Sequence, residues 1–309
     1  MSAIPGILLG VLVLMQSCIG NKPTGCGVEV RFRYVKNVES YLTGTEVDKY
    51  SEQVGSITLF VFDEKGIFID QFREEGEHLG AGHVIRMPLN SGKYKLVAWG
   101  NLCEDFSIPQ CAGGLTDIGD LLVTINHQSG NVGKHPAHLF FGSADLQIVE
   151  SETYVSLTID LTKDTNYIHV KKSGLPVSGD LAGSNFSCAI TAYNEACKFD
   201  NTITGETCLT YTPQRSVDGA NYISEFVTMR ELNGGEARSR LIITYTPQEG
   251  QEEELVNTPL TPLLLQVAQT GDLDIDDEFY LDVSFDFSGG TAVISINGWI
   301  ITDDEWILG

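Results

Sequence analysis

Basic residues are scarce in this chain of 309 residues, which has 19 lysines and arginines against 42 aspartates and glutamates and a formal net charge of −23. A nucleic acid is a polyanion, so a protein that binds one needs a clustered basic face. Attachment to anionic lipids through basic residues needs such a cluster as well. The charge balance therefore argues against both modes of binding, and we expect no nucleic-acid partner.

Familiar catalytic motifs are also missing. The sequence contains no G-x-S-x-G elbow, no H-E-x-x-H pair, no P-loop and no Rossmann glycine fingerprint. Paired carboxylates could still hydrolyse sugars, because a β-sandwich enzyme positions them by its fold. Among 42 acidic residues, however, some pair lies close by chance. We expect a protein that is not an enzyme, with no catalytic residue and no cofactor.

Patterns typical of metal sites are weak. No C-x-x-C pair occurs, and His127, His135 and His138 have no carboxylate or cysteine at ligand spacing beside them. The acidic run 272–278, DLDIDDE, lacks the glycine that an EF-hand loop requires midway. We therefore expect no metal site, and we interpret the acidic run as a solvated approach to a strand.

Long apolar runs are absent apart from residues 7–18, ILLGVLVLMQSC. This run is shorter than the roughly 20 residues that span a bilayer, but it fits the apolar region of a signal peptide. Its end resembles a bacterial lipobox, although Met15 stands where leucine is usual and the first ten residues lack Lys and Arg. A soluble secreted protein or a buried N-terminal strand are the alternatives. We expect cleavage between Ser17 and Cys18 and lipidation of Cys18.

The cysteine count is seven, and lipidation of Cys18 leaves six. An even number is typical of disulfides in an exported protein. The sequence cannot choose among the possible pairings, but Cys103 and Cys111 enclose a short polar loop and form the candidate disulfide. We also expect two of the remaining cysteines of the second half to pair. Those cysteines are Cys188, Cys197 and Cys208.

Apolar residues alternate with polar ones along many short segments, which predicts β-strands. In residues 28–34 the alternating residues are Val28, Val30, Phe32 and Tyr34. Further strands are predicted at residues 57–63, 67–72, 83–89, 93–99, 154–161, 167–171, 186–193, 207–211, 222–229, 240–246, 262–267 and 279–287. No long amphipathic helix is evident, so the sequence predicts an all-β protein with strands at β-sandwich spacing.

Turn residues predict how some of these strands connect. The glycine of DEKG, at residues 63–66, predicts a hairpin, and NSG predicts a second one between residues 83–89 and 93–99. The pair Asn297-Gly298 predicts a type I′ hairpin. Residues 101–114 read as a long loop, and residues 117–126 fit a helix or a strand equally well. The polar residues 162–166 predict a domain boundary.

The three tryptophans, Trp99, Trp299 and Trp306, admit two interpretations. Exposed rings could form a platform on which sugars stack. Each tryptophan adjoins apolar strand residues, however, which favours packing in a core.

Several strings occur in a distinctive order. They are VEVRFRY shortly after Cys26, then LFVFDEKG, SGKYKLVAWGN, HLFFGSADL, LTKDTNYIHV and finally SINGWII. Together they resemble the FimB-type anchor lipoproteins of type V fimbriae, over nearly the whole mature chain. The resemblance implies two tandem transthyretin-like, Greek-key β-sandwich domains after a lipoprotein signal peptide. The implied divisions are signal peptide 1–17, lipidated tether 18–27, N-terminal sandwich 28–163 and C-terminal sandwich 164–309.

The resemblance also implies a function. Such a protein is a lipid-anchored subunit in the outer membrane, facing the exterior, which holds the base of a fimbrium, contacts stalk or accessory subunits and influences filament length. Its own first strand, here residues 28–34, is expected to stay in place. The hairpin at 293–306 is a candidate contact with the next subunit, and an internal hairpin of a sheet is the alternative. Competing hypotheses are a stalk or tip subunit, a glycan-binding surface lipoprotein and, least favoured, an exported hydrolase.

Overall fold

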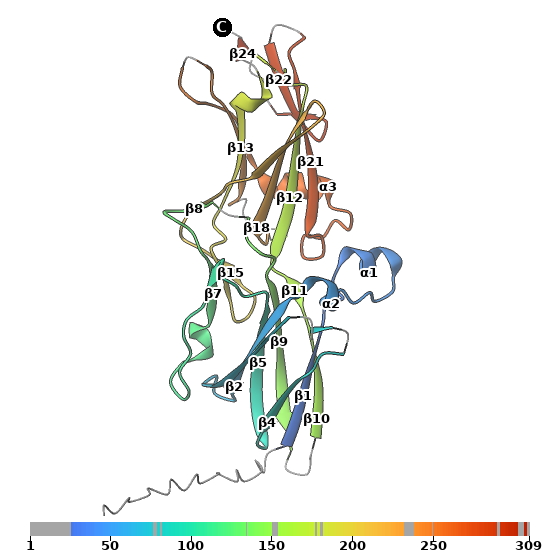
Figure 1. The fold of residues 1–309 in the computed structure, drawn as a ribbon, viewed down its shortest axis with the longest axis vertical. Helices are drawn as coiled ribbons and strands as arrows, with labels where there is room; N and C mark the ends of the chain where they lie inside the picture. The colour runs from blue at the N-terminus through green and yellow to red at the C-terminus, as the bar shows by residue number, and fades with distance from the viewer. Residues whose placement is uncertain are drawn as a thin grey trace, which may run out of the picture.

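The structure, a computed structural model, describes residues 26–76, 79–80, 82–133, 135–149, 154–176, 178–179, 182–231, 238–248, 250–288, 291–301 and 306–307. The described chain forms an elongated body built mainly of β-strands that follow its long axis (Figure 1). The all-β class predicted from the sequence is confirmed.

Two sheets lie face to face in the part of the molecule that contains the start of the described chain. One has the order β10–β1–β4 and the other has the order β11–β9–β5–β2–β3. Their strands are β1 (Cys26–Arg33), β2 (Ser56–Asp63), β3 (Phe68–Glu75), β4 (Ile85–Leu89), β5 (Gly92–Gly100), β9 (Phe140–Ile148), β10 (Tyr154–Asp160) and β11 (Thr162–Lys163). Val30, Ile57, Leu59 and Ile159 are among the apolar side chains buried between them.

Two further sheets form the opposite part of the molecule. One has the order β17–β18–β12–β21–β22–β23 with β24 also paired to β22, and the other has the order β20–β19–β13–β16–β8. Their strands are β8 (Asn131–Val132), β12 (Thr165–Ser173), β13 (Phe186–Ala192), β16 (Leu209–Tyr211), β17 (Gln214–Asp218), β18 (Asn221–Met229), β19 (Arg240–Tyr245), β20 (Glu253–Pro259), β21 (Glu278–Asp286), β22 (Thr291–Ile296), β23 (Trp299–Ile300) and β24 (Trp306–Ile307).

Strand pairing crosses the predicted boundary between residues 163 and 164. A small sheet has the order β15–β14–β7–β6, with β6 (Phe106–Ser107) and β7 (Leu122–Ile125) from one side of the boundary and β14 (Ala196–Lys198) and β15 (Ile203–Thr204) from the other. Strand β8 likewise pairs with β16. The second core is continuous across the same point, because Trp99 and Phe186 belong to one cluster of buried residues. The division into two tandem domains stays a prediction.

Helices are short and lie outside the sheets. In the described part of the chain they include α1 (Val38–Thr43), α2 (Tyr50–Gln53), α3 (Leu260–Val267) and the 3₁₀ turns at Ile118–Asp120 and Gly183–Asn185. Asn37 begins α1 by accepting a hydrogen bond from the Ser40 amide, and Gly44 ends it in the left-handed conformation. These caps explain a helix in a segment that lacks a helical apolar face.

Most predicted strands and two turns are confirmed. Asn297 and Gly298 both have positive φ and join β22 to β23, as the type I′ prediction requires. Gly66, with φ 82°, likewise closes the turn between β2 and β3. Residues 117–126 form a 3₁₀ turn followed by β7, which settles the choice that the sequence left open.

Three predictions of secondary structure are wrong. Strands β4 and β5 do not form a hairpin: β4 pairs with β1, whereas β5 pairs with β2 and β9, so the turn between them passes from one sheet to the other. Residues 262–267 belong to α3, because Leu260, Leu263 and Leu264 follow helical spacing and are all buried. Finally, residues 101–114 are not wholly loop, since they contain β6.

Candidate functional site: the first strand and the junction it reaches

Strand β1 occupies the centre of its sheet. It runs parallel to β10, with Val28 opposite Val155 and Phe32 opposite Ile159, and antiparallel to β4 on its other side. Its alternating apolar side chains point into the core between the two sheets. The four predicted residues, Val28, Val30, Phe32 and Tyr34, are all buried. A strand at these residues is thus confirmed, and it pairs with β10 on one side and with β4 on the other; its retention as a first strand stays a prediction.

Ion pairs fix the edges of this strand. Arg33 contacts Asp160 of β10 at 2.8 Å and Glu46 at 2.9 Å. On the other side Glu29 pairs with Arg86 of β4 at 2.8 Å. Arg33 and Asp160 are substantially exposed, so their pair contributes little to stability but helps to fix the register.

The end of the first strand touches the distant half of the chain. Tyr34 directly follows β1, and its hydroxyl donates to Asp277 at 3.3 Å. Asp277 precedes β21 and pairs with Lys163 at 2.7 Å. The pKa of Tyr34 is raised, first by burial and then by the Asp277 carboxylate, so the phenol stays protonated and acts as a donor. One carboxylate therefore holds two segments that lie far apart in sequence.

A second buried polar cluster lies beside this junction. Asp164 is fully buried, and its Oδ1 lies 3.3 Å from Nε of Arg230 without hydrogen-bond geometry. Arg230 also pairs with Asp274 at 2.7 Å, and the Cys197 thiol contacts Asp164 at 3.4 Å. Burial raises the pKa of Asp164 to about 6, and the Arg230 guanidinium opposes that rise. The acidic run at 272–278 therefore supplies partners inside the protein, where the sequence indicated a solvated segment.

Asp276 of the same run also has an internal partner. Its carboxylate accepts hydrogen bonds from the amides of Gln269 and Thr270, at 2.9 Å each. Among the described residues, no group of three or more His, Cys, Asp or Glu side chains is placed to hold a metal ion.

The three loop histidines each have a different principal partner. His127 pairs with Glu195 at 3.0 Å, His138 contacts the Thr165 hydroxyl at 3.0 Å, and the ring of His135 packs edge-on against Tyr167. Burial lowers the pKa of His138 to about 4, so its ring is neutral near pH 7. Each histidine is thus part of a separate local contact.

Some predicted site residues lie outside the described residues. These are Ser17 and Cys18, so cleavage and lipidation stay predictions.

The Cys103 thiol lies 3.5 Å from the Asp105 carboxylate, and the Cys111 thiol lies 3.7 Å from the Pro109 carbonyl oxygen. Both are thiols in this structure, so the disulfide between them also stays a prediction. Cys188 and Cys197 are buried thiols, whereas Cys208 is an exposed one.

The tryptophans do not share one environment. Trp99 is fully buried against Phe60 and Phe141, as core packing predicts. Trp299 is 65% exposed beside Ile300, which is 64% exposed, on β23 at the edge of its sheet. The expectation that Trp299 packs in a core is therefore wrong, and Trp99 cannot contribute to a surface platform.

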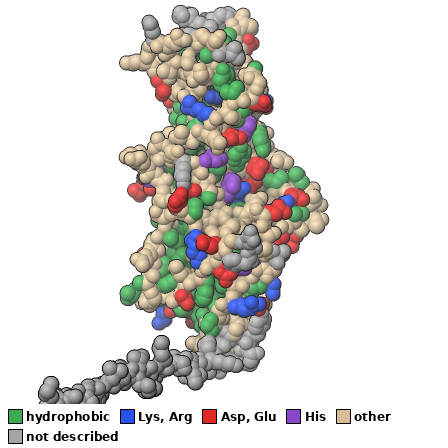
Figure 2. Space-filling view, viewed as in Figure 1, with side chains coloured by type: hydrophobic (Ala, Val, Ile, Leu, Met, Phe, Trp, Pro, Cys, Tyr) green, Lys and Arg blue, Asp and Glu red, His purple; other side chains and the backbone are tan. Residues whose placement is uncertain are grey.

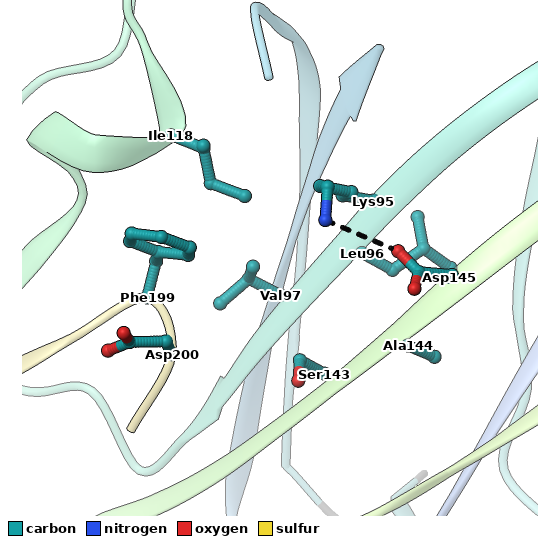
Figure 3. Close-up of a pocket in the computed structure, with 9 residues that line it drawn as sticks. All are labelled: Lys95, Leu96, Val97, Ile118, Ser143, Ala144, Asp145, Phe199 and Asp200. Atoms are coloured by element: carbon teal, nitrogen blue, oxygen red, sulfur yellow. Dashed lines mark ion pairs between the residues drawn. The ribbon is translucent and has the colours of Figure 1, made fainter. Parts of the chain in front are cut away.

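A pocket of about 420 Å³ lies where the small crossing sheet meets β5 and β9. In Figure 3, Phe199 and Ile118 lie on the side opposite the Lys95–Asp145 pair, with Val97 between them. Lys95 and Asp145 pair across the pocket wall at 3.6 Å. A lining that combines apolar side chains with a few polar groups is typical of a small-ligand site. Sequence reasoning missed this pocket, because its walls come from both sides of the predicted boundary.

Acidic side chains are scattered over the face of the molecule seen in Figure 2. No helix in the described part of the chain is long and apolar enough to cross a membrane.

The comparison with family models gives a match over residues 22–305, nearly the whole chain, to the fimbrillin-A associated anchor proteins Mfa1 and Mfa2. The chain belongs to this family. Members are fimbrial anchor or fimbria-associated proteins, so the chain is grouped with fimbrial subunits of the cell surface. No curated protein matches it.

Solved structures of other proteins share the fold of this chain. The fimbrial anchor protein Mfa2 from Porphyromonas gingivalis is 22% identical, with a TM-score of 0.73, over 90% of this chain and 99% of that one. A putative adhesin from Bacteroides ovatus is 23% identical, with a TM-score of 0.75, over 89% and 95%. A putative polysaccharide binding protein from Bacteroides thetaiotaomicron is 21% identical, with a TM-score of 0.72, over 91% and 99%.

Proposed function

We propose that this protein is a lipid-anchored, non-enzymatic subunit that holds the base of a fimbrium in the outer membrane, faces the cell exterior and influences filament length. Acylated Cys18 is the attachment to the membrane, and stalk or accessory subunits are the partners. The mature chain consists of two tandem sandwiches, at 28–163 and 164–309.

The observation that carries the proposal is the position of β1. Proteins assembled by β-strand addition accept a partner's strand into a groove, where backbone hydrogen bonds give affinity and alternating pockets give specificity. Here the chain's own β1 fills the groove, paired on both sides and with its apolar side chains buried. Burial of each such side chain contributes about 1.5–3 kcal/mol, which opposes displacement of β1. A subunit with a closed groove suits the end of a filament better than its middle.

The partner-facing surface in this proposal is the exposed edge at β23. Trp299 and Ile300 leave apolar area in water there, and tryptophan is enriched where protein partners bind. The partner that binds to this edge is a fimbrial stalk or accessory subunit.

The test compares cells that produce wild-type protein with cells that produce Cys18→Ala, by membrane fractionation and electron microscopy. We expect the variant to leave the outer membrane and filaments to be shed into the medium. A Cys208→Ala variant, which alters an exposed cysteine of the second half of the chain, is the matched control and should behave as wild type. Retention of the Cys18→Ala protein in the membrane, or unchanged filaments, would contradict the proposal.

The pocket of Figure 3 favours saccharide binding as a second function. The Phe199 ring offers a stacking surface, and Asp200 and Ser143 supply hydrogen-bonding groups beside it. Because Lys95 is already paired with Asp145, a neutral sugar fits this site better than an anionic one. A glycan array tests this: saturable binding that Phe199→Ala abolishes supports it, whereas binding unchanged in that variant rejects this pocket.

A further inference from the structure

The first and last parts of the described chain lie at opposite ends of the molecule. Strand β1 begins at one end with Cys26, and β22 and β24 lie at the other end (Figure 1). Strand β1 also runs close to the long axis, toward the centre of the molecule. A force that pulls Cys26 away from the far end therefore acts along the strand.

This direction determines how the hydrogen bonds of β1 are loaded. The parallel ladder with β10 extends from Gly27 opposite Tyr154 to Arg33 opposite Asp160, and a second ladder joins β1 to β4. A force along the strand shears both ladders, so their bonds share the load and must break together. A force across the strand would instead open one ladder bond by bond. The buried side chains of β1 must also leave the core before the strand can slide.

The inner end of β1 is tied directly to the far half of the chain. The Tyr34 hydroxyl contacts Asp277, which is followed at once by β21. Strand β21 pairs with both β12 and β22, in the sheet that carries the C-terminal hairpin. Load on β1 therefore reaches the last sheet through Tyr34 and Asp277 as well as through the covalent chain.

We propose that β1 is a shear clamp that bears tension between the N-terminal attachment and the far end of the molecule. The inference rests on the proposed function, because tension arises only if the N-terminal side is tethered and the far end holds a filament. The clamp gives β1 a mechanical role in addition to filling the groove.

Single-molecule force spectroscopy on the purified full mature chain tests the clamp. In one geometry the handles are at the two chain termini, which loads β1 in shear. In the second they are at the N-terminus and at Ser91, which is exposed and follows β4 close to Leu89, the partner of Cys26. This second geometry opens the β1–β4 ladder from its end. We expect the first rupture to need a several-fold higher force in the first geometry, because forced unfolding depends on the barrier along the pulling direction. Equal or lower force in the first geometry would overturn the proposal.

A pair of matched variants tests whether the resistance to the pulling force lies in β1. Val30→Ala in β1 and Val256→Ala in β20 remove the same atoms from buried sites. We expect only Val30→Ala to lower the first rupture force with handles at the termini, and an equal effect of the two variants would argue against β1. If Val30→Ala does not fold, the comparison of the two pulling geometries on wild-type protein still tests the proposal. Neither measurement involves a membrane or a filament, so its outcome is independent of the Cys18→Ala experiment.

Discussion

The Tyr34 hydroxyl donates a hydrogen bond to the Asp277 carboxylate, 3.3 Å away and 243 positions along the chain. The Lys163 ammonium contacts the same Oδ2 atom of Asp277, at 2.7 Å. The Lys163 side chain is 4% exposed and that of Asp277 is 16% exposed, so both charges are largely withdrawn from water. These contacts connect the end of the first strand, the junction and the start of β21.

Removing either partner of Asp277 should destabilise the protein, to different degrees. Lys163→Met leaves a largely buried carboxylate without its cation and should lower the free energy of unfolding by about 3 kcal/mol or more. Tyr34→Phe removes one hydrogen bond and should cost about 1 kcal/mol. Urea denaturation measures both. The control is Tyr94→Phe, whose hydroxyl contacts the Asn90 carbonyl at an exposed site and should cost little. A larger loss for Tyr34→Phe than for Lys163→Met would contradict this account.

Gly142 lies at a tight contact between β9 and the end of β10. A Cβ atom at this position would lie 2.6 Å from the Ile159 side chain and 2.9 Å from the Asp160 carbonyl oxygen. Gly142→Ala should therefore force the strands apart and cost about 1–3 kcal/mol, the range for overpacked cores. Chemical denaturation compares it with Gly113→Ala, whose Cβ atom would lie 3.8 Å from the Ile69 carbonyl oxygen. Equal stability of the two variants would show that the sheets adjust without strain.

The sequence predicted well the strands and turns that depend on a few neighbouring residues. The alternation of Val28, Val30 and Phe32 gave the first strand, and Asn297-Gly298 gave the last hairpin, because each depends on a few neighbouring residues. Which strand pairs with which, in contrast, depends on the whole fold. The turn after Leu89 has the residues of a hairpin, yet β4 pairs with β1, because the turn leads from one sheet to the other.

The candidate site could be predicted only in part. The apolar face of β1 was readable, but its contact with Asp277 was not, because the two lie at opposite ends of the sequence. The acidic run that contains Asp274 and Asp277 has the composition of a solvated segment, and only the fold supplies Arg230 and Lys163 as partners. Trp299 follows a strong turn signal, but nothing local tells that its strand is at a sheet edge.

Glu231 should make stability depend on pH. Its side chain is buried, its two oxygens each accept from the Ser239 hydroxyl at 2.6 Å, and burial raises its pKa to about 6. A carboxyl group whose pKa is higher in the folded state binds more protons there, so its contribution to stability is lost as pH rises from about 4.5 to about 6. Glu231→Gln carries no charge and should avoid this loss.

Urea denaturation of wild type and Glu231→Gln at pH 4 and pH 8 checks this expectation. The free energy of unfolding of the variant minus that of wild type should be larger at pH 8 than at pH 4. Glu254→Gln in β20, at an exposed position, is the control and should not reproduce the effect. A difference between Glu231→Gln and wild type that is the same at both pH values would exclude the proposed titration.

The disulfide proposed between Cys103 and Cys111 can be checked in exported protein. After oxidation, both thiols should resist alkylation together until a reductant is added, and peptide mapping should find them linked. Cys208 is exposed and serves as the internal control, since it should react without reductant unless it forms a disulfide itself. Alkylation of Cys103 and Cys111 before reduction would leave the pairing without support.

Trp299 should matter for assembly more than for folding. Its side chain is 65% exposed on β23, so Trp299→Ser removes apolar surface from solvent contact without opening the core. We expect a several-fold loss of fimbrial subunits that co-purify with the protein, because exposed aromatic side chains often dominate binding energy. Tyr280→Ser is the matched control, since Tyr280 is 55% exposed on β21, which β22 separates from the edge at β23. Thermal unfolding should show both variants folded. If both lose the subunits equally, or neither does, the edge at β23 is not the contact, and the subunit must bind elsewhere on the molecule.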